Sequence, residues 1–173
     1  GLAILAGDAL NTLAFKLIAN YPKAVAELAT ALMTVVAGQV EDIKAGKRQL
    51  SLADLKRIHG WKTAALLKAC VRGSAAICGS PPSKLKALTA YAGHLGLAFQ
   101  IADDILDVTS SRKKLGKPVK ADVKKGFPYV VGLEKSRQLA EIEKEKAIGA
   151  LNNFGRRAEV LRKIADFVVA RKA

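Results

Sequence analysis

Apolar residues recur at the spacing of an α-helix along most of the chain. No stretch alternates apolar and polar residues for long enough to predict a sheet. The 173 residues, half of them apolar, suffice for one domain with a sizeable core. We therefore predict a single all-α domain over residues 1–173. The helical period is visible in one segment at Val25, Leu28, Leu32, Val36 and Ile43.

Prolines, glycines and capping residues mark where the helices should begin and end. Pro22 ends the first predicted helix, and Ser51 with Asp54 forms a capping-box pattern. Residues 110–128 are basic and punctuated by glycine and proline, which predicts a loop long enough to have a function. The predicted helices cover residues 3–19, 23–45, 51–78, 84–109, 129–150 and 156–172.

The net charge is +14, which is compatible with a nucleic acid, an anionic membrane surface, a phosphorylated ligand or simply solvated lysines. Cys70 and Cys78 lie about two helical turns apart, too far for a disulfide, so we expect buried free thiols in a reducing cytoplasm. Polar residues interrupt every long apolar run, so we expect no membrane span.

Three carboxylates interrupt an apolar helix in the stretch "GLAFQIADDILDVTS", residues 96–110. Asp103, Asp104, Asp107 and Gln100 are related by steps of three and four residues, so they project from one helix face. Burying such carboxylates unpaired would cost several kcal/mol each. Oxygen ligands favour Mg²⁺, which shares its coordination with substrate phosphates. A solvated acidic face is the alternative.

Basic residues could complete a phosphate site. Lys62 interrupts a helix rich in alanine and leucine, and Lys117 follows Gly116 in the loop, although a snorkelling or solvated lysine is the simpler interpretation of each. Gln39 and Asp42 form a weaker polar interruption of another apolar helix. We interpret three further residues as structural, namely His59, His94 and Trp61.

The order and approximate spacing of several motifs resemble the polyprenyl synthetase family, the trans-prenyltransferases that make farnesyl, geranylgeranyl and longer diphosphates. The resemblance covers essentially the whole chain. Its most specific part is "FQIADDILD", which looks like the second aspartate-rich motif, DDxxD. The other matching motifs are "AGDALNTLAF", "GQVEDI", "IHGWKTAALL", "LGKP" and "GLEKSR".

The resemblance implies an isoprenoid-synthase helical bundle around a central apolar cavity, normally a homodimer. It implies Asp103 as a direct Mg²⁺ ligand, with Asp104 and Asp107 ligating the ion or ordering its waters. Lys62 and Lys117 would bind an allylic diphosphate. The remaining implied residues are Thr63 and Gln100 beside the lysines, and Asp122 as the holder of metal-bound water.

The implied reaction is the Mg²⁺-dependent head-to-tail condensation of an allylic diphosphate with isopentenyl diphosphate. The first DDxxD motif, expected upstream of "AGDALNTLAF", is not in this sequence. We therefore expect that N-terminal helices are absent and that this fragment is inactive alone. The loop before "GLEKSR" is also shorter than usual and lacks a lysine and a threonine. The alternatives are a non-catalytic partner subunit, a terpene cyclase on the same fold and a basic nucleic-acid-binding domain.

Overall fold

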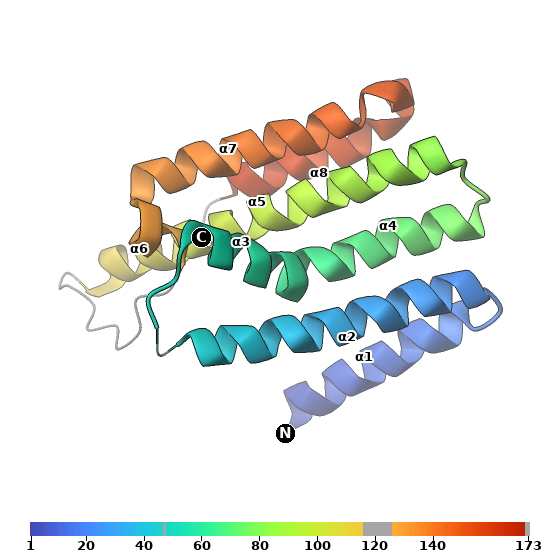
Figure 1. The fold of residues 1–173 in the computed structure, drawn as a ribbon, viewed down its shortest axis with the longest axis horizontal. Helices are drawn as coiled ribbons and strands as arrows, with labels where there is room; N and C mark the ends of the chain where they lie inside the picture. The colour runs from blue at the N-terminus through green and yellow to red at the C-terminus, as the bar shows by residue number, and fades with distance from the viewer. Residues whose placement is uncertain (47, 116–125, 172–173) are drawn as a thin grey trace.

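The computed structural model describes residues 1–46, 48–115 and 126–171, and all regular structure in these residues is helical (Figure 1). Its long helices are α1 (Leu2–Ile18), α2 (Pro22–Ala45), α4 (Ala65–Ile77), α5 (Pro82–Leu115), α7 (Leu133–Ala150) and α8 (Glu159–Ala170). Its shorter elements are α3 (Leu52–His59), a π-helical turn η1 (Gly60–Ala64), α6 (Phe127–Val131) and a 3-10 segment η2 (Asn152–Ala158).

The long helices lie side by side in the order α1, α2, α4, α5 and α7, and α8 packs behind α5 and α7 (Figure 1). Two apolar clusters hold the array together. One lies where α5 meets α7 and α8 and includes Tyr91 and Leu151. The other includes Ile58, Ile101 and Phe127 and lies beside the aspartates of α5. The second cluster gives those aspartates a packed, apolar base.

The predicted helix boundaries hold best where capping residues define them. The helices predicted for 3–19 and 23–45 occur as Leu2–Ile18 and Pro22–Ala45. The capping box is confirmed, because Ser51 N–H donates to Asp54 Oδ2 at 3.2 Å and Asp54 N–H donates to Ser51 Oγ at 3.1 Å. The all-α prediction is therefore confirmed in its class, and the boundaries hold for the first two helices and at the start of α3.

Other boundaries were predicted wrongly. The helix expected over 51–78 contains the π-helical turn, and α5 extends to Leu115, into the stretch predicted as the start of a loop. Residues 116–125 lie outside the described residues. Gly132, with φ of +84°, separates α6 from α7 inside the predicted helix 129–150. The last predicted helix begins as the 3-10 segment, which bends at Gly155 with φ of +57°.

Exposed apolar side chains cover much of the first two helices. None of the residues of α1, all of them described, is buried, and α2 exposes Met33, Val36 and Ile43. Helix α2 is long and apolar enough to cross a membrane by length and composition, contrary to the expectation that no segment would qualify. One such helix is weak evidence, because core helices of soluble proteins meet the same criteria. Its carboxylates Glu27 and Asp42 pair with basic residues of the neighbouring helical segment, so α2 is held in the bundle.

The two cysteines are free, as expected, but both are exposed rather than buried. Cys70 lies on α4 and Cys78 directly follows it. Free cysteines are usually buried, but the position of Cys70 on α4 and that of Cys78 after it leave both side chains exposed.

Candidate functional site

One face of α5 carries the predicted acidic cluster. Asp103 and Asp104 are half-buried there, and Asp107 one turn further is exposed. Asp104 is the most enclosed of the three, with 12% of its side chain exposed. Both of its oxygens accept hydrogen bonds from the protein, Oδ1 from Gln100 Nε2 at 3.1 Å and Oδ2 from the N–H of Phe127 at 2.9 Å. Asp104 is therefore fixed in orientation.

Gln100 connects α5 to the π-helical turn. Its Oε1 accepts a hydrogen bond from Thr63 Oγ1 at 3.0 Å, while its Nε2 donates to Asp104. This chain of hydrogen bonds explains why a glutamine lies on the acidic face, because the amide donates and accepts at once. Gln100 lies on the acidic face as predicted, and Thr63 follows Lys62 in the π turn, but both side chains are engaged with protein groups. Their contact with a substrate stays a prediction.

The π-helical turn places Lys62 against α2. Lys62 Nζ lies 2.8 Å from Asp42 Oδ2, and both side chains are about one-quarter to one-third exposed. A π turn inserts one extra residue into a helix and often occurs at functional sites. Gly38 makes the close approach possible, because a Cβ there would lie 2.6 Å from the backbone nitrogen of Lys62. The polar pair Gln39 and Asp42 thus contributes one residue, Asp42, to the same region as Lys62.

A second glycine sets the distance between the π turn and α5. A Cβ at Gly96 would lie 2.6 Å from both the Cα and the Cβ of Ala64. This contact lies one turn before Gln100 on α5 and directly after Thr63. The two glycines therefore let three helical segments approach closely around Lys62, Thr63 and Gln100.

Arg171, at the end of α8, forms an ion pair with Asp103. Its guanidinium also lies 4.1 Å from the centre of the Phe99 ring, in a cation–π arrangement. Asp103 is thus neutralised by a residue 68 positions away in sequence. Sequence analysis did not identify Arg171, and no local spacing could have done so.

His59 lies directly beneath the acidic cluster. Only 6% of the residue is exposed, and neither ring nitrogen has a hydrogen-bond partner among the described residues. Nε2 is 4.0 Å from Asp104 Oδ2, and the ring stacks on Phe127 with centroids 5.6 Å apart. Burial lowers the pKa of His59 to about 4, with Asp42 opposing and Lys62 adding to the effect. The imidazole is neutral at neutral pH, so its contact with Asp104 is no salt bridge.

Burial and neighbouring like charges disfavour the charged form of Asp104. Burial raises the pKa of Asp104, the bonds from Phe127 and Gln100 oppose this, and the charges of Asp107 and Asp103 raise it further. A carboxylate that is desolvated and surrounded by like charges gains from any added positive charge. Among residues 1–46, 48–115 and 126–171, no three His, Cys, Asp or Glu side chains are grouped to hold a metal ion by themselves.

Oxygen donors without cysteine or converging histidine fit Mg²⁺ and not zinc. Because Mg²⁺ keeps waters and shares phosphate oxygens, it does not need a complete protein cage. The residues that could hold it here are Asp103 and Asp107, with Asp104 held behind them. Two further predicted residues, Lys117 and Asp122, lie outside the described residues, so their part in the site stays a prediction.

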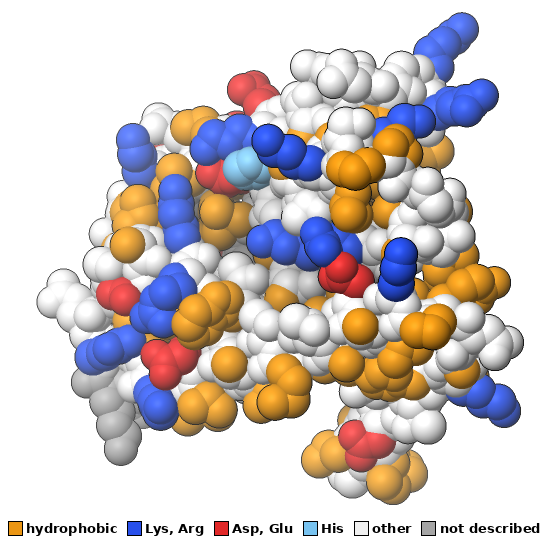
Figure 2. Space-filling model, turned by 45° about the vertical axis from the view of Figure 1, so that its right-hand side comes forward, with side chains coloured by type: hydrophobic (Ala, Val, Ile, Leu, Met, Phe, Trp, Pro, Cys, Tyr) orange, Lys and Arg blue, Asp and Glu red, His pale blue; other side chains and the backbone are white. Residues whose placement is uncertain are grey.

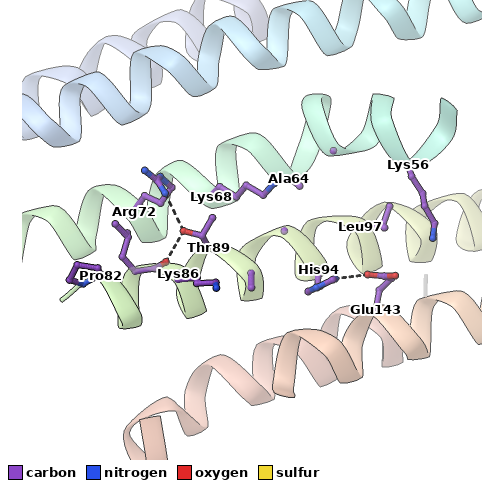
Figure 3. Close-up of a pocket in the computed structure, with 14 residues that line it drawn as sticks. Lys56, Ala64, Lys68, Arg72, Pro82, Lys86, Thr89, His94, Leu97 and Glu143 are labelled. Atoms are coloured by element: carbon purple, nitrogen blue, oxygen red, sulfur yellow. Dashed lines mark hydrogen bonds and ion pairs between the residues drawn. The ribbon is translucent and has the colours of Figure 1, made fainter. Parts of the chain in front are cut away.

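A groove of about 750 Å³ runs between the π turn, α4, α5 and α7, and Figure 2 shows basic side chains gathered around a hollow on that side. Two pairs of its polar groups bind each other: Arg72 Nη1 donates to Thr89 Oγ1 at 3.3 Å, and His94 Nδ1 lies 2.7 Å from Glu143 Oε2 (Figure 3). Arg72 also donates to Glu27 of α2 at 2.6 and 2.7 Å. No aspartate is among its described lining residues, so we place the candidate site at the acidic cluster.

The structure shows what surrounds the three residues interpreted as structural from the sequence. His94 has a partner in Glu143, which the sequence spacing did not indicate. Trp61 is 38% exposed and lies under the guanidinium of Arg57 at 5.2 Å, so it is not a core residue. His59 is buried, but it is buried against Asp104.

An acidic helix face and the Lys62–Asp42 pair lie at one end of a helical bundle, an arrangement that suits the class of helical proteins that bind a cation and an anionic ligand. Comparison with known proteins narrows that class. Residues 1–166 match the Polyprenyl synthetase family. The chain is 40% identical to the geranylgeranyl diphosphate synthase of Cyanophora paradoxa, and the match covers 98% of this chain and 62% of that protein. It is 34% identical to the farnesyl diphosphate synthase of Bacillus subtilis (strain 168), with the same coverage of each.

Solved structures agree. The polyprenyl synthase from Caulobacter crescentus CB15, crystallised with calcium and isoprenyl diphosphate, matches with a TM-score of 0.80 and 27% identity, over 99% of this chain and 66% of that one. The polyprenyl synthetase from Streptomyces coelicolor A3(2) matches with a TM-score of 0.81 and 26% identity, over 97% and 66%. The chain belongs to the polyprenyl synthetase family. It spans about three-fifths of the length of the curated relatives described above.

Proposed function

We propose that the protein catalyses the Mg²⁺-dependent head-to-tail condensation of an allylic diphosphate with isopentenyl diphosphate, giving a longer polyprenyl diphosphate. The observation that carries the proposal is the acidic face of α5 held in register with Lys62 by the chain of hydrogen bonds from Thr63 through Gln100 to Asp104. Relatives named as geranylgeranyl and farnesyl diphosphate synthases support the substrate class.

In this proposal Asp103 and Asp107 hold Mg²⁺, and Asp104 keeps the acidic face oriented. When bound, the ion supplies positive charge that stabilises the leaving diphosphate. Asp42 holds the ammonium of Lys62 in place at 2.8 Å, so that the lysine is ready to contact a phosphate oxygen. The relative crystallised with calcium and isoprenyl diphosphate supports this combination of a divalent cation with a diphosphate.

The carbon chemistry needs a dry surrounding, because water would quench an allylic cation. Apolar residues around the aspartates, among them Ile101 and Ile105, limit the water that reaches this end of α5. The double bond of isopentenyl diphosphate attacks the cation, and no protein nucleophile is needed. The proton is lost to the released diphosphate.

The part of the chain that the structure describes presents one acidic face, whereas the proposed reaction uses two that face each other. We propose that the second face comes from protein outside residues 1–173. The 173-residue chain alone would then not convert the two diphosphate substrates. Exposed apolar residues of α1 and α2 would then be covered in a homodimer or by that further protein.

A non-catalytic partner subunit of the same fold is the main alternative. A pure binding subunit does not require the aspartates, Lys62 or the hydrogen bonds that orient them. Terpene cyclisation on this fold would require only the allylic substrate. Dependence of product formation on isopentenyl diphosphate therefore distinguishes a prenyltransferase from a terpene cyclase. A nucleic-acid-binding domain leaves the acidic cluster unexplained.

The test is to incubate the full-length protein with Mg²⁺, isopentenyl diphosphate and a series of allylic diphosphates, and to identify the products by mass spectrometry. We expect chain elongation that Asp103→Ala reduces by orders of magnitude. Asp166→Ala, at an exposed position of α8, is the matched control and should leave turnover unchanged. Full turnover by the Asp103 variant would remove that residue from the metal site.

A further inference from the structure

His59 is a buried polar side chain whose hydrogen-bonding capacity is unused. It is 94% buried, since 6% of the residue is exposed, and neither Nδ1 nor Nε2 has a partner among the described residues. Leaving buried polar groups unpaired costs about 1–3 kcal/mol. Such groups in a native protein need an explanation, and a role at a neighbouring site is one of the few available.

The geometry identifies Asp104 as the group that His59 serves. Nε2 is 4.0 Å from Asp104 Oδ2, so an approach of about 1 Å would reach the usual range for an N–H···O bond. The ring is held in that direction by stacking on Phe127, whose own N–H donates to the same oxygen. Phe127 thus provides both the stacking contact with His59 and a hydrogen bond to Asp104.

Charged groups surround the imidazole on several sides. Asp42 of α2 and Lys62 of the π turn both act on it, in opposite senses, and Asp104 lies across the gap on α5. A neutral imidazole can place one N–H towards a carboxylate without adding a charge that would compete with a metal ion. An arginine or lysine at the same place would neutralise Asp104 instead.

We propose that His59 is a positioning residue for the acidic cluster. Its Nε2–H completes a set of three donors around Asp104, together with Gln100 Nε2 and the N–H of Phe127. The hydrogen bond closes when a divalent cation and a diphosphate draw the cluster together. Asp104 is then locked in place, and Asp103 and Asp107 can face the ligand. The inference rests on the proposed function, because it assumes that the cluster binds a cation.

A purely structural role for His59 makes a different prediction. Packing alone would be served as well or better by leucine, which fills similar volume and buries no polar atoms. Under the positioning role, leucine removes the donor and weakens cation binding while leaving stability equal or higher. Glutamine keeps a donor at a comparable reach and should restore binding. The two variants therefore separate packing from hydrogen bonding.

The experiment titrates the full-length protein with Mn²⁺ in the presence of inorganic pyrophosphate and follows free Mn²⁺ by electron paramagnetic resonance. We expect His59→Leu to weaken Mn²⁺ binding about tenfold or more, the usual effect of removing a residue that orients a metal ligand. His59→Gln should bind close to the parent protein. His94→Gln, at a histidine that pairs with Glu143 and not with the acidic cluster, is the matched control and should not change binding.

Thermal unfolding of each variant without metal completes the test. The proposal is supported if His59→Leu is at least as stable as the parent protein yet binds Mn²⁺ more weakly. Equal Mn²⁺ affinity of parent and His59→Leu overturns it, as does an equal loss of affinity in His59→Gln and His59→Leu. A parent protein that binds no Mn²⁺ with pyrophosphate contradicts the proposed function itself, an outcome distinct from the failure of His59 alone.

Discussion

The backbone N–H of Phe127 donates to Oδ2 of Asp104 at 2.9 Å, and this bond joins α5 to the start of α6 across 23 positions of sequence. It fixes the start of α6 against α5. The carboxylate that accepts this bond is part of the acidic face. The orientation of the acidic cluster and the placement of the segment that follows α5 are therefore coupled.

Gly126 tests this coupling. It has φ of +109°, and a Cβ there would lie 2.7 Å from Asp104 Oδ2. Gly126→Ala should therefore lower the free energy of unfolding by about 1–3 kcal/mol and weaken cation binding. Gly132→Ala is the matched control, because Gly132 has φ of +84° with nothing within 4 Å of its Cβ. The Gly132→Ala variant has the backbone strain of a positive φ but no contact with Asp104. Urea denaturation and Mn²⁺ titration of both variants measure the difference, and equal Mn²⁺ affinity would argue against the coupling.

Gly38 gives a second test, on the other wall of the site. A methyl group there meets the backbone of Trp61 and Lys62 at 2.6–2.9 Å, so α2 and the π turn must separate. We expect Gly38→Ala to cost about 1–3 kcal/mol and to lower turnover of the full-length enzyme, because Lys62 moves from Asp42. Gly7→Ala, in the interior of α1 with open space around it, should instead stabilise the protein by up to about 1 kcal/mol. Equal effects of the two substitutions would show that the close approach does not matter.

Local patterns in the sequence predicted much of the fold. Ser51 and Asp54 predicted the start of α3, and the steps between Gln100, Asp103, Asp104 and Asp107 predicted one acidic helix face. Both depend only on helix geometry. The π turn could not be predicted, because an extra residue in a helix leaves no compositional signal and is stabilised here by close packing at Gly38 and Gly96.

The partners of the acidic residues could not be predicted either. His59 is 45 positions from Asp104, and Arg171 is 68 positions from Asp103. Such contacts depend on how helices pack, and a single sequence carries no direct record of them. A buried histidine in an apolar helix has the same sequence pattern whether it packs passively or faces a carboxylate.

Tyr91 should make the protein sensitive to alkaline pH. It is 2% exposed, its hydroxyl donates to the carbonyl of Leu161 at 2.8 Å, and burial raises its pKa to about 12. The folded state then holds a proton that the unfolded state loses near pH 10. The stabilisation that Tyr91 provides is therefore fully present below pH 10 and is lost as pH rises towards 12. The loss is at most about 2–3 kcal/mol. Tyr91→Phe should be about 1 kcal/mol less stable at pH 7. By urea denaturation, it should also lose less stability between pH 9 and 11.5, and parallel curves would contradict the assignment.

Arg171 and a divalent cation should compete for Asp103. The guanidinium is the cation that neutralises Asp103 in the described structure, and its stacking on Phe99 holds it there. Arg171→Gln should therefore lower the melting temperature without metal, because a half-buried carboxylate loses its ion pair. Mg²⁺ with pyrophosphate should stabilise this variant more than the parent protein, because binding no longer displaces the arginine. Lys163→Gln, on the exposed surface of α8, should change neither the melting temperature without metal nor the stabilisation by Mg²⁺ with pyrophosphate. Weaker Mn²⁺ binding by Arg171→Gln than by the parent would mean that Arg171 supports the metal site instead of competing with it.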